Sequence, residues 1–517
     1  MKLITRPLQR KIKDGVVALT LATWCLARPW SHLLFKSKDY FGGSPALPVE
    51  LLAVMVNVAG LALAIWLGIG LWRNWRGGMA GALLDGAFLL LMVFPADFIR
   101  VDMLSMTDGE LLGFMRRPAV MAGLFGALAL LLWKHRPAAR LLGVMLWVSF
   151  PAALLVLAKL SLTFVGLMPL KDCASVPAAP ALLHVAEGRP RVIWMIFDET
   201  DYRLAFEKRP ANVPLPEFDR LRLSALSADH AYPPGDSTLF SMPALIAGRR
   251  VEAARPEGCE LAVKLAGADD TADWSALPSV FSRARELGCN TALVGWYHPY
   301  ARMLGGSLNY CAWYPFPLYE PARSTTFGGA AREQIASLAS SYHIRRLYIE
   351  TCRHSLADAV AAADNPAYGL VLLHLPPPHG PGVYLPEKDQ FTCEGIAAPA
   401  GYFNNLVLAD RELGVLRRNM ETAGLWDKSW VLLSADHSWR KSKLYDGVRD
   451  YRVPFVLKSP EAGPSMVCTN MFNTVLTHDL VLAILRNEVT NQAGAAALLA
   501  RGAPEMPVLE GQHGSSQ

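Results

Sequence analysis

The stretch RVIWMIFDET (residues 191–200) is the part of the sequence that most strongly indicates the fold. Residues 192–197 form a continuous apolar run, which is typical of a central strand whose two faces are both buried. Two carboxylates, Asp198 and Glu199, follow this run directly. Because open α/β sheets bind ligands at the carboxyl ends of their strands, the stretch predicts a strand with a functional site at its end.

Four further runs have the same character, and the segments between them carry apolar residues at helical spacing. A Pro- and Ala-rich stretch at 175–183 precedes the first run. This alternation predicts an α/β sandwich domain over residues 190–500, with a linker at 171–189 and a tail at 501–517. The further strand runs are 290–296 (NTALVGW), 369–375 (GLVLLHL), 429–436 (SWVLLSAD) and 453–458 (VPFVLK).

The N-terminal third is much more apolar than a soluble domain. The chain of 517 residues is 52% hydrophobic and only 18% charged, and its mean hydropathy is +0.22. A membrane-crossing helix needs roughly 20 apolar residues. A fifth run, at about 14–35, is broken by Arg28 and Pro29 and either crosses the membrane or lies in its interface. The sequence therefore predicts a multi-span α-helical membrane domain of about five helices over residues 1–170. The four unbroken runs are 46–72, 79–99, 118–133 and 141–168.

Charge and cysteine content narrow the interpretation. With five spans, ten Lys and Arg residues lie on the N-terminal side of the membrane and six on the other. The positive-inside rule then predicts a cytoplasmic N-terminus and an external α/β domain. The net charge of +5, without a basic block in the second half, argues against a nucleic-acid partner. Seven of the eight cysteines fall in the external part, where disulfides can form, but their spacing does not determine the pairing.

Candidate metal ligands end two of the predicted strands. Asp436 and His437 offer one carboxylate oxygen and one imidazole nitrogen, a combination suited to zinc or manganese. Adjacent carboxylates such as Asp198 and Glu199 are costly to bury unless a cation neutralises them. The residues alone leave open that Asp198 and Glu199 are solvated or cap a helix. Asp85 and Asp97, in the third predicted span, are expected to make polar contacts between helices.

Two further segments carry candidate catalytic groups. In PPGDSTLFSMPALIAGR (233–249), Ser237 or Thr238 would lie at a helix N-terminus, where backbone N–H groups hold an anion, so either is a candidate nucleophile. The alternative is a simple helix cap. In HLPPPHGP (374–381), His374 or His379 could donate a hydrogen bond to a phosphoryl oxygen, although a loop histidine is often inert.

Taken in order, these four groups resemble the alkaline phosphatase/sulfatase superfamily. An N-terminal membrane domain followed by an external domain is similar to its membrane-anchored branch, the phosphoethanolamine transferases and lipoteichoic acid synthases. The strongest local likenesses are to the transferases, and the resemblance covers nearly the whole chain. They are Glu199-Thr200, HGPGVYLPEKDQFTC (379–393) and the helical pattern at 402–417.

The resemblance implies a metal site. Glu199, Asp436 and His437 would be the ligands, and Asp198 would be a fourth ligand or belong to a second site. His379 would contact the substrate phosphate. The metal would be divalent, with zinc expected first and manganese or calcium as alternatives.

The resemblance also implies a nucleophile. Thr238 lies ten residues before Gly248, as in the phosphodiesterase and sulfatase members, so Thr238 is the first candidate and Ser237 the second. The Cys/Ser-x-Pro-x-Arg signature of the formylglycine sulfatases is absent, which argues against sulfate ester hydrolysis. A second departure is Ser438-Trp439, where many members carry Gly-Glu.

The function that the resemblance implies is a membrane-bound, metal-dependent transferase in a bacterial inner membrane, with its catalytic domain periplasmic or extracellular. It would move a phosphoethanolamine-type or other phospholipid head group onto an envelope glycan or lipid, through a phospho-threonine intermediate. The phospholipid donor, the acceptor and the membrane would be its partners. Two alternatives stay open: a phosphodiesterase or atypical sulfatase of the same superfamily, and an inactive membrane scaffold.

Overall fold

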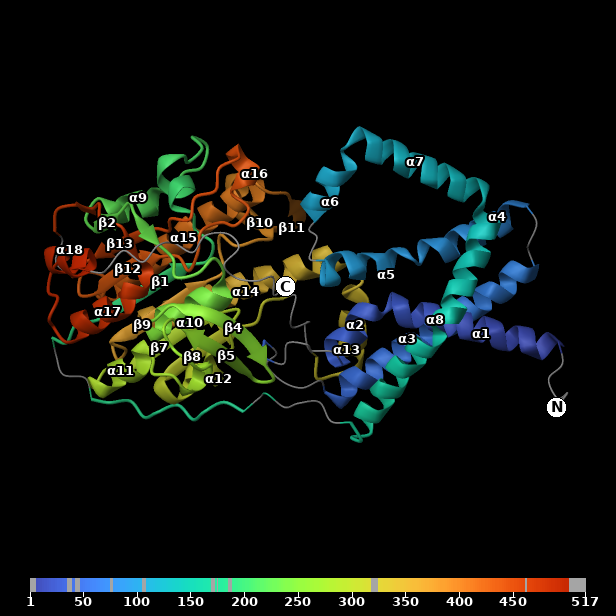
Figure 1. Ribbon diagram of the computed structural model, residues 1–517, viewed down its shortest axis with the longest axis horizontal. Coiled ribbons are helices and arrows are strands. Elements are labelled where there is room, and N and C mark those ends of the chain that lie inside the picture. The colour runs from blue at the N-terminus through green and yellow to red at the C-terminus, as the bar shows by residue number, and fades with distance from the viewer. Residues whose placement is uncertain are drawn as a thin grey trace. The chain divides into compact units, whose positions relative to one another are not determined.

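A computed structural model describes the chain with short gaps and divides it into two compact units (Figure 1). Unit 1 comprises Met1–Ser37, Ser44–Asp172 and Pro317–Ile344, and unit 2 comprises Lys38–Gly43, Cys173–Phe316 and Arg345–Gln517. Residues 317–344, inside the predicted catalytic domain, therefore group with the N-terminal helices. Most of the predicted tail, 502–517, lies outside the described residues. The described residues are 6–34, 40–41, 47–74, 78–104, 108–168, 173, 175–184, 188–317, 324–460 and 463–501.

Unit 1 is helical. By length and composition, three of its segments could cross a membrane: Pro48–Arg73, Met79–Met103 and Pro137–Phe164. They correspond to three of the five predicted spans. The predicted span at 118–133 is a shorter helix of 16 residues. The helices are α1 (Arg6–Cys25), α2 (Ala27–Leu34), α3 (Pro48–Asn74), α4 (Gly78–Leu90), α5 (Val93–Phe98), the π-helical turn η1 (Ile99–Met103), α6 (Asp108–Met115), α7 (Pro118–Trp133), α8 (His135–Phe164) and α13 (Phe327–Ala336).

The predicted fifth run, at 14–35, is divided between α1 and α2. Pro29 lacks the N–H that would donate to the carbonyl of Cys25, so the helix cannot continue regularly across this point. Buried Arg28 begins the next turn, where it donates to Asp102 (Nε–Oδ2 2.8 Å) and to the carbonyl of Ser337 (2.8 Å).

The two aspartates of the third predicted span contact side chains from other helices. Asp85 lies 2.5 Å from His135 of α8. Asp97 pairs with Arg100 and lies 3.5 Å from Arg28 of α2. The predicted role of both aspartates in helix packing is confirmed.

Unit 2 is built on an eight-stranded sheet in the order β14-β2-β13-β12-β1-β9-β7-β8. The five predicted strand runs are five neighbouring strands of this sheet, from β13 to β7. All pairs among them are parallel except β12 with β13. The strands are β1 (Val192–Phe197), β2 (Leu226–Ala228), β7 (Thr291–Trp296), β8 (Tyr310–Tyr314), β9 (Leu370–Leu375), β12 (Trp430–Ser434), β13 (Phe455–Lys458) and β14 (Met466–Cys468).

Helices cover both faces of this sheet, as the α/β sandwich prediction requires (Figure 1). Every residue of β1 is buried. On one face, Ile193, Met195 and Phe197 pack in a core with α9 (Pro216–Arg222), the end of α14 (Ser340–Ala363) and α15 (Ala400–Thr422). On the other face lie α11 (Val280–Glu286) and α17 (Thr477–Leu485). α10 (Thr238–Ala247) packs on α17 and carries the site described below. The remaining strands form small sheets: β4 (Val251–Glu257), β5 (Glu260–Leu265), β6 (Ala272–Asp273), β10 (Gly382–Leu385), β11 (Gln390–Ile396), β3 (Ala231–Tyr232) and β15 (Phe472–Asn473).

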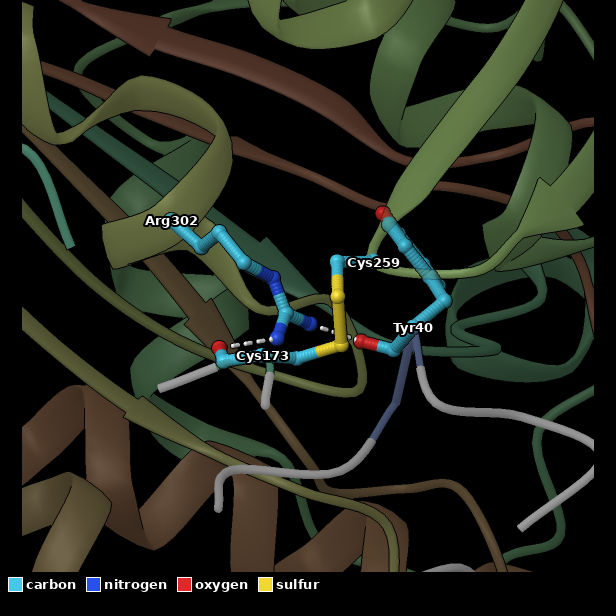
Figure 2. Close-up of a disulfide and its surroundings, with 4 residues drawn as sticks. All are labelled: Tyr40, Cys173, Cys259 and Arg302. Atoms are coloured by element: carbon cyan, nitrogen blue, oxygen red, sulfur yellow. Dashed lines mark hydrogen bonds between the residues drawn. A yellow bond between two sulfur atoms is a disulfide. The ribbon is translucent and has the colours of Figure 1, made fainter. Parts of the chain in front are cut away.

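The described part of the predicted linker is attached to unit 2. Leu183 exchanges two hydrogen bonds with the side chain of Asn290. Cys173 forms a disulfide with Cys259, with a Cα–Cα distance of 5.3 Å (Figure 2). Among the described residues, the other six cysteines are free. The described part of the linker is therefore attached to the surface of unit 2 at both Cys173 and Leu183.

Candidate active site

The site lies where β1 and β12 end. The register pairs Ile196 with Ser434, so two residues further along each strand bring Asp198 and Asp436 side by side. His437 follows Asp436. Thr238 is the first residue of α10, whose N-cap is Ser237. Gly248 follows the last residue of α10 and has the left-handed conformation (φ 70°). A Cβ at this position would lie 2.5 Å from His478, so glycine is required there. The ten-residue spacing between Thr238 and Gly248 is therefore the length of α10.

The side chains of Thr238, Asp198, Asp436 and His437 converge on one buried point. Thr238 Oγ1 lies 2.8 Å from Asp436 Oδ2, 3.4 Å from Asp198 Oδ2 and 3.3 Å from His437 Nε2. One ligand atom from each of Asp198, Asp436 and His437 lies within 4.8 Å of the others. The structure thus brings together four of the eight residues that the sequence singled out for the site.

The chemistry of this group fits a divalent cation. Burial, together with the neighbouring Asp436 carboxylate, raises the pKa of Asp198 to about 8. Asp198 Oδ1 is buried without a hydrogen-bond partner. His437 Nδ1 lies 3.1 Å from the carbonyl of Ser438, to which it can only donate, so the lone pair of the neutral ring is on Nε2, facing the carboxylates. Two carboxylates and one imidazole around a hydroxyl suit zinc or manganese.

Glu199 lies outside this three-residue group. Its side chain pairs with Arg440 (Nε–Oε1 3.2 Å), and its backbone N–H donates to Asp436 Oδ1 (3.3 Å). Burial opposes the ionisation of Glu199, but His379 and Arg440 outweigh it and hold its pKa below the usual range. Its φ of 63° is unusual for a residue with a side chain, and such conformations cluster at functional sites. The geometry gives Glu199 the task of orienting Asp436.

His379 is half-buried in the loop after β9, with its orientation fixed. Its ring packs edge-on against Trp296, with 5.0 Å between ring centroids. Its Nδ1 lies 2.7 Å from the carbonyl of Gly380, and its own carbonyl accepts from Tyr348 and Asn405. Ser237, the second nucleophile candidate, is half-buried, and its hydroxyl makes no capping hydrogen bond.

Two other residues lie at the site: His374, which the sequence offered as an alternative to His379, and Arg440, which the sequence did not identify. His374 is fully buried in β9, with Nε2 3.6 Å from Asp198 Oδ2 and Nδ1 2.8 Å from the Tyr300 hydroxyl. Burial lowers the pKa of His374 to about 4, so it is neutral at pH 7. HLPPPHGP contains His374, but only the register of β9 beside β1 places it against Asp198. Arg440 follows the Asp-His pair by three residues, and no spacing rule identifies it.

Trp439, which stands where many members of the superfamily carry Glu, has a structural role. The Trp439 ring stacks on Tyr402 with 4.1 Å between centroids and 8° between planes. The Tyr402 hydroxyl donates to the carbonyl of Glu199 (3.1 Å). Trp439 therefore supports the strained residue that holds Asp436.

No family model matches the sequence, and no curated protein matches it. Solved structures similar to the chain include a phosphonate monoester hydrolase from Agrobacterium radiobacter (14% identity, covering 62% of this chain and 79% of that one, TM-score 0.37). They also include a sulfatase from Pseudoalteromonas sp. (14%, 61% and 74%, 0.40) and a protein of the alkaline phosphatase superfamily from Vibrio parahaemolyticus (13%, 60% and 70%, 0.38). These are members of the superfamily that the motifs resemble.

Proposed function

We propose that the protein is a membrane-bound, metal-dependent transferase of substituted phosphate groups, with Thr238 as its nucleophile. It moves a phosphoethanolamine-type or other phospholipid head group onto an envelope glycan or lipid. One observation carries the proposal: the Thr238 hydroxyl, at the N-terminus of α10, lies within 3.4 Å of Asp198, Asp436 and His437. A hydroxyl in this place is a candidate for metal-assisted attack on phosphorus.

In this reaction each residue has a defined task. A divalent cation held by Asp198, Asp436 and His437 would supply charge neutralisation and a lowered hydroxyl pKa. The Thr238 hydroxyl donates to Asp436 Oδ2, which orients Oγ1 for attack. A bond forms between Oγ1 and phosphorus, and the bond from phosphorus to the lipid alcohol breaks in line. His379 would contact a phosphoryl oxygen through Nε2.

The second half-reaction decides between the two enzyme classes. An acceptor hydroxyl that attacks phospho-Thr238 gives a transferase, whereas water gives a phosphodiesterase. The convergent group itself contains no residue that selects the acceptor, so the same four side chains serve either outcome. Three helices long and apolar enough to cross a membrane support a tethered domain, which favours a lipid donor and a transferase.

The nucleophile is tested with two adjacent substitutions in the full chain. Thr238→Ala should abolish turnover of the chromogenic diester bis(4-nitrophenyl) phosphate and leave thermal stability and metal content near wild type. Ser237→Ala is the matched control and should stay active, because the Ser237 hydroxyl makes no capping hydrogen bond. Even the loss of a formed helix cap would cost only about 1 kcal/mol of stability.

Mass spectrometry after incubation with phosphatidylethanolamine vesicles should find a phosphoethanolamine adduct on Thr238. An active Thr238→Ala protein, or an adduct on Ser237, would contradict the assignment. Release of free phosphoethanolamine without any added acceptor would identify the phosphodiesterase.

A further inference from the structure

Tyr40 and Phe41 lie between α2 and α3 in the sequence, but they belong to unit 2. Both side chains are buried there, with 0% and 3% of their surface exposed. The Phe41 ring packs edge-on against Tyr297, with 5.0 Å between centroids. The Tyr40 ring meets the ring of His298 in the same way, at 5.9 Å. A short segment from among the N-terminal helices is thus part of the core of the catalytic unit.

Arg302 holds this segment in place (Figure 2). Its guanidinium donates to the backbone carbonyl of Tyr40 and to that of Cys173, the latter at 2.6 Å. Cys173 is itself tied to Cys259 by the disulfide. One buried cation therefore joins Tyr40 to a covalently fixed point of unit 2.

Two hydrogen bonds in series, through His298, connect the Tyr40 hydroxyl to the backbone of Thr238. The hydroxyl lies 2.8 Å from His298 Nδ1, and His298 Nε2 lies 2.9 Å from the backbone carbonyl of Thr238. A carbonyl only accepts, so Nε2 carries the hydrogen. Burial lowers the pKa of His298 to about 3, which keeps the ring neutral. Nδ1 is then an acceptor, and the Tyr40 hydroxyl is the donor that fixes this tautomer.

We propose that Tyr40 is a positioning residue for Thr238 and acts through His298. The carbonyl that His298 binds and the attacking Oγ1 belong to the same residue, so the hydrogen bonds that fix the first turn of α10 also fix the direction of attack. A nucleophile displaced by about 1 Å can lose on the order of 100-fold in rate. The proposal rests on the proposed function of Thr238. It adds that the segment between two N-terminal helices is required for an efficient active site.

The test is a double-mutant cycle in the full chain, assayed with bis(4-nitrophenyl) phosphate. Tyr40→Phe keeps the ring and removes only the donor, so kcat should fall about 10-fold with KM and metal content unchanged. His298→Leu should lower kcat about 100-fold. Adding Tyr40→Phe to His298→Leu should cause no further loss, because the route from Tyr40 to Thr238 is already broken. His298→Gln, which keeps a donor, should recover part of kcat.

Two controls separate positioning from general stability. Tyr342→Phe removes the hydroxyl of an exposed tyrosine and should leave kcat unchanged. Phe41→Leu disturbs the packing of the same segment but keeps the Tyr40 hydroxyl, so it should lower stability more than kcat. Wild-type kcat in Tyr40→Phe, losses that multiply in the double variant, or an equal loss of kcat in Phe41→Leu would each overturn the proposal.

Hydrogen exchange gives a readout that does not depend on activity. Amides of residues 238–241, in the first turn of α10, should exchange faster in Tyr40→Phe than in wild type or Tyr342→Phe. Unchanged exchange would overturn the positioning role. A wild-type enzyme that turns over no phosphodiester would count against the proposed function, while the exchange measurement would still decide the role of Tyr40.

Discussion

Asp198 and Glu199 are neighbours in the sequence, but they occupy different positions in the site. Asp198 continues the direction of β1 and meets Asp436 across the register. Glu199 turns into the left-handed conformation, and its carboxylate pairs with Arg440. The family resemblance favoured Glu199 as the ligand, with Asp198 as an additional candidate. Residue type alone could not separate the two carboxylates, because the deciding backbone angle depends on contacts from Tyr402 and Arg440, which are distant in sequence.

Metal content should distinguish these two carboxylates. Asp198→Asn and Asp436→Asn each remove a charge from the convergent group, so elemental analysis of the purified protein should show the divalent metal reduced to trace levels. Glu199→Gln is the matched control. It should retain most of the metal, because the side chain of Glu199 binds Arg440 and lies outside the group. Loss of metal in Glu199→Gln, with retention in Asp198→Asn, would restore the ligand set that the resemblance implied.

At the scale of elements, the strands were the most predictable part. The five apolar runs became β1, β7, β9, β12 and β13, because strands buried on both faces need unbroken apolar sequence. β2 and β14 have three residues each, too few for a periodic signal. β2 forms against the edge of β13, and β14 then pairs with β2. The sequence did not predict that the described part of the linker is attached to unit 2, through Asn290 and the Cys173–Cys259 disulfide, because these partners are distant in sequence.

Breaking the Cys173–Cys259 disulfide should destabilise the attachment of the linker to unit 2 and of the neighbouring segment at Tyr40. The bridge closes a loop with a sequence separation of 86 residues, and native disulfides typically contribute about 2–4 kcal/mol. Cys259→Ser should therefore lower the thermal midpoint of unfolding by several degrees. Cys393→Ser, which removes a free and half-buried thiol, is the matched control. Equal midpoints for the two variants, or no effect of a reductant on wild type, would show that the bridge does not contribute.

For the whole molecule, the position of Tyr40 restricts the path of the chain. Tyr40 and Cys173 both accept hydrogen bonds from Arg302, so they lie on the same side of any membrane that the chain crosses. The chain must then cross an even number of times between residues 41 and 173. The three long apolar helices in this interval give an odd number. The simplest solution is a fourth crossing by α7, whose 16 residues rise about 24 Å, slightly short of the roughly 30 Å hydrocarbon core.

An even number of crossings agrees with the four spans that the sequence predicted in this interval, and the fifth span, at 14–35, stays a prediction. Length alone would have excluded α7, but Arg117 and Lys134 flank it and can extend to the two interfaces while the bilayer thins. With these four spans, the positive-inside rule predicts that Arg116 and Lys134 lie on opposite sides of the membrane, with Lys134 on the cytoplasmic side.

Labelling in intact cells tests this arrangement. A membrane-impermeant maleimide should label Arg116→Cys above the wild-type background and should label Lys134→Cys only after permeabilisation. Both side chains are exposed, so a difference between them reports the side of the membrane and not burial. If α7 lies on the external surface, both cysteines will react in intact cells. That result would require one of the three longer helices to remain outside the membrane as well, because residues 40 and 173 must still share one side.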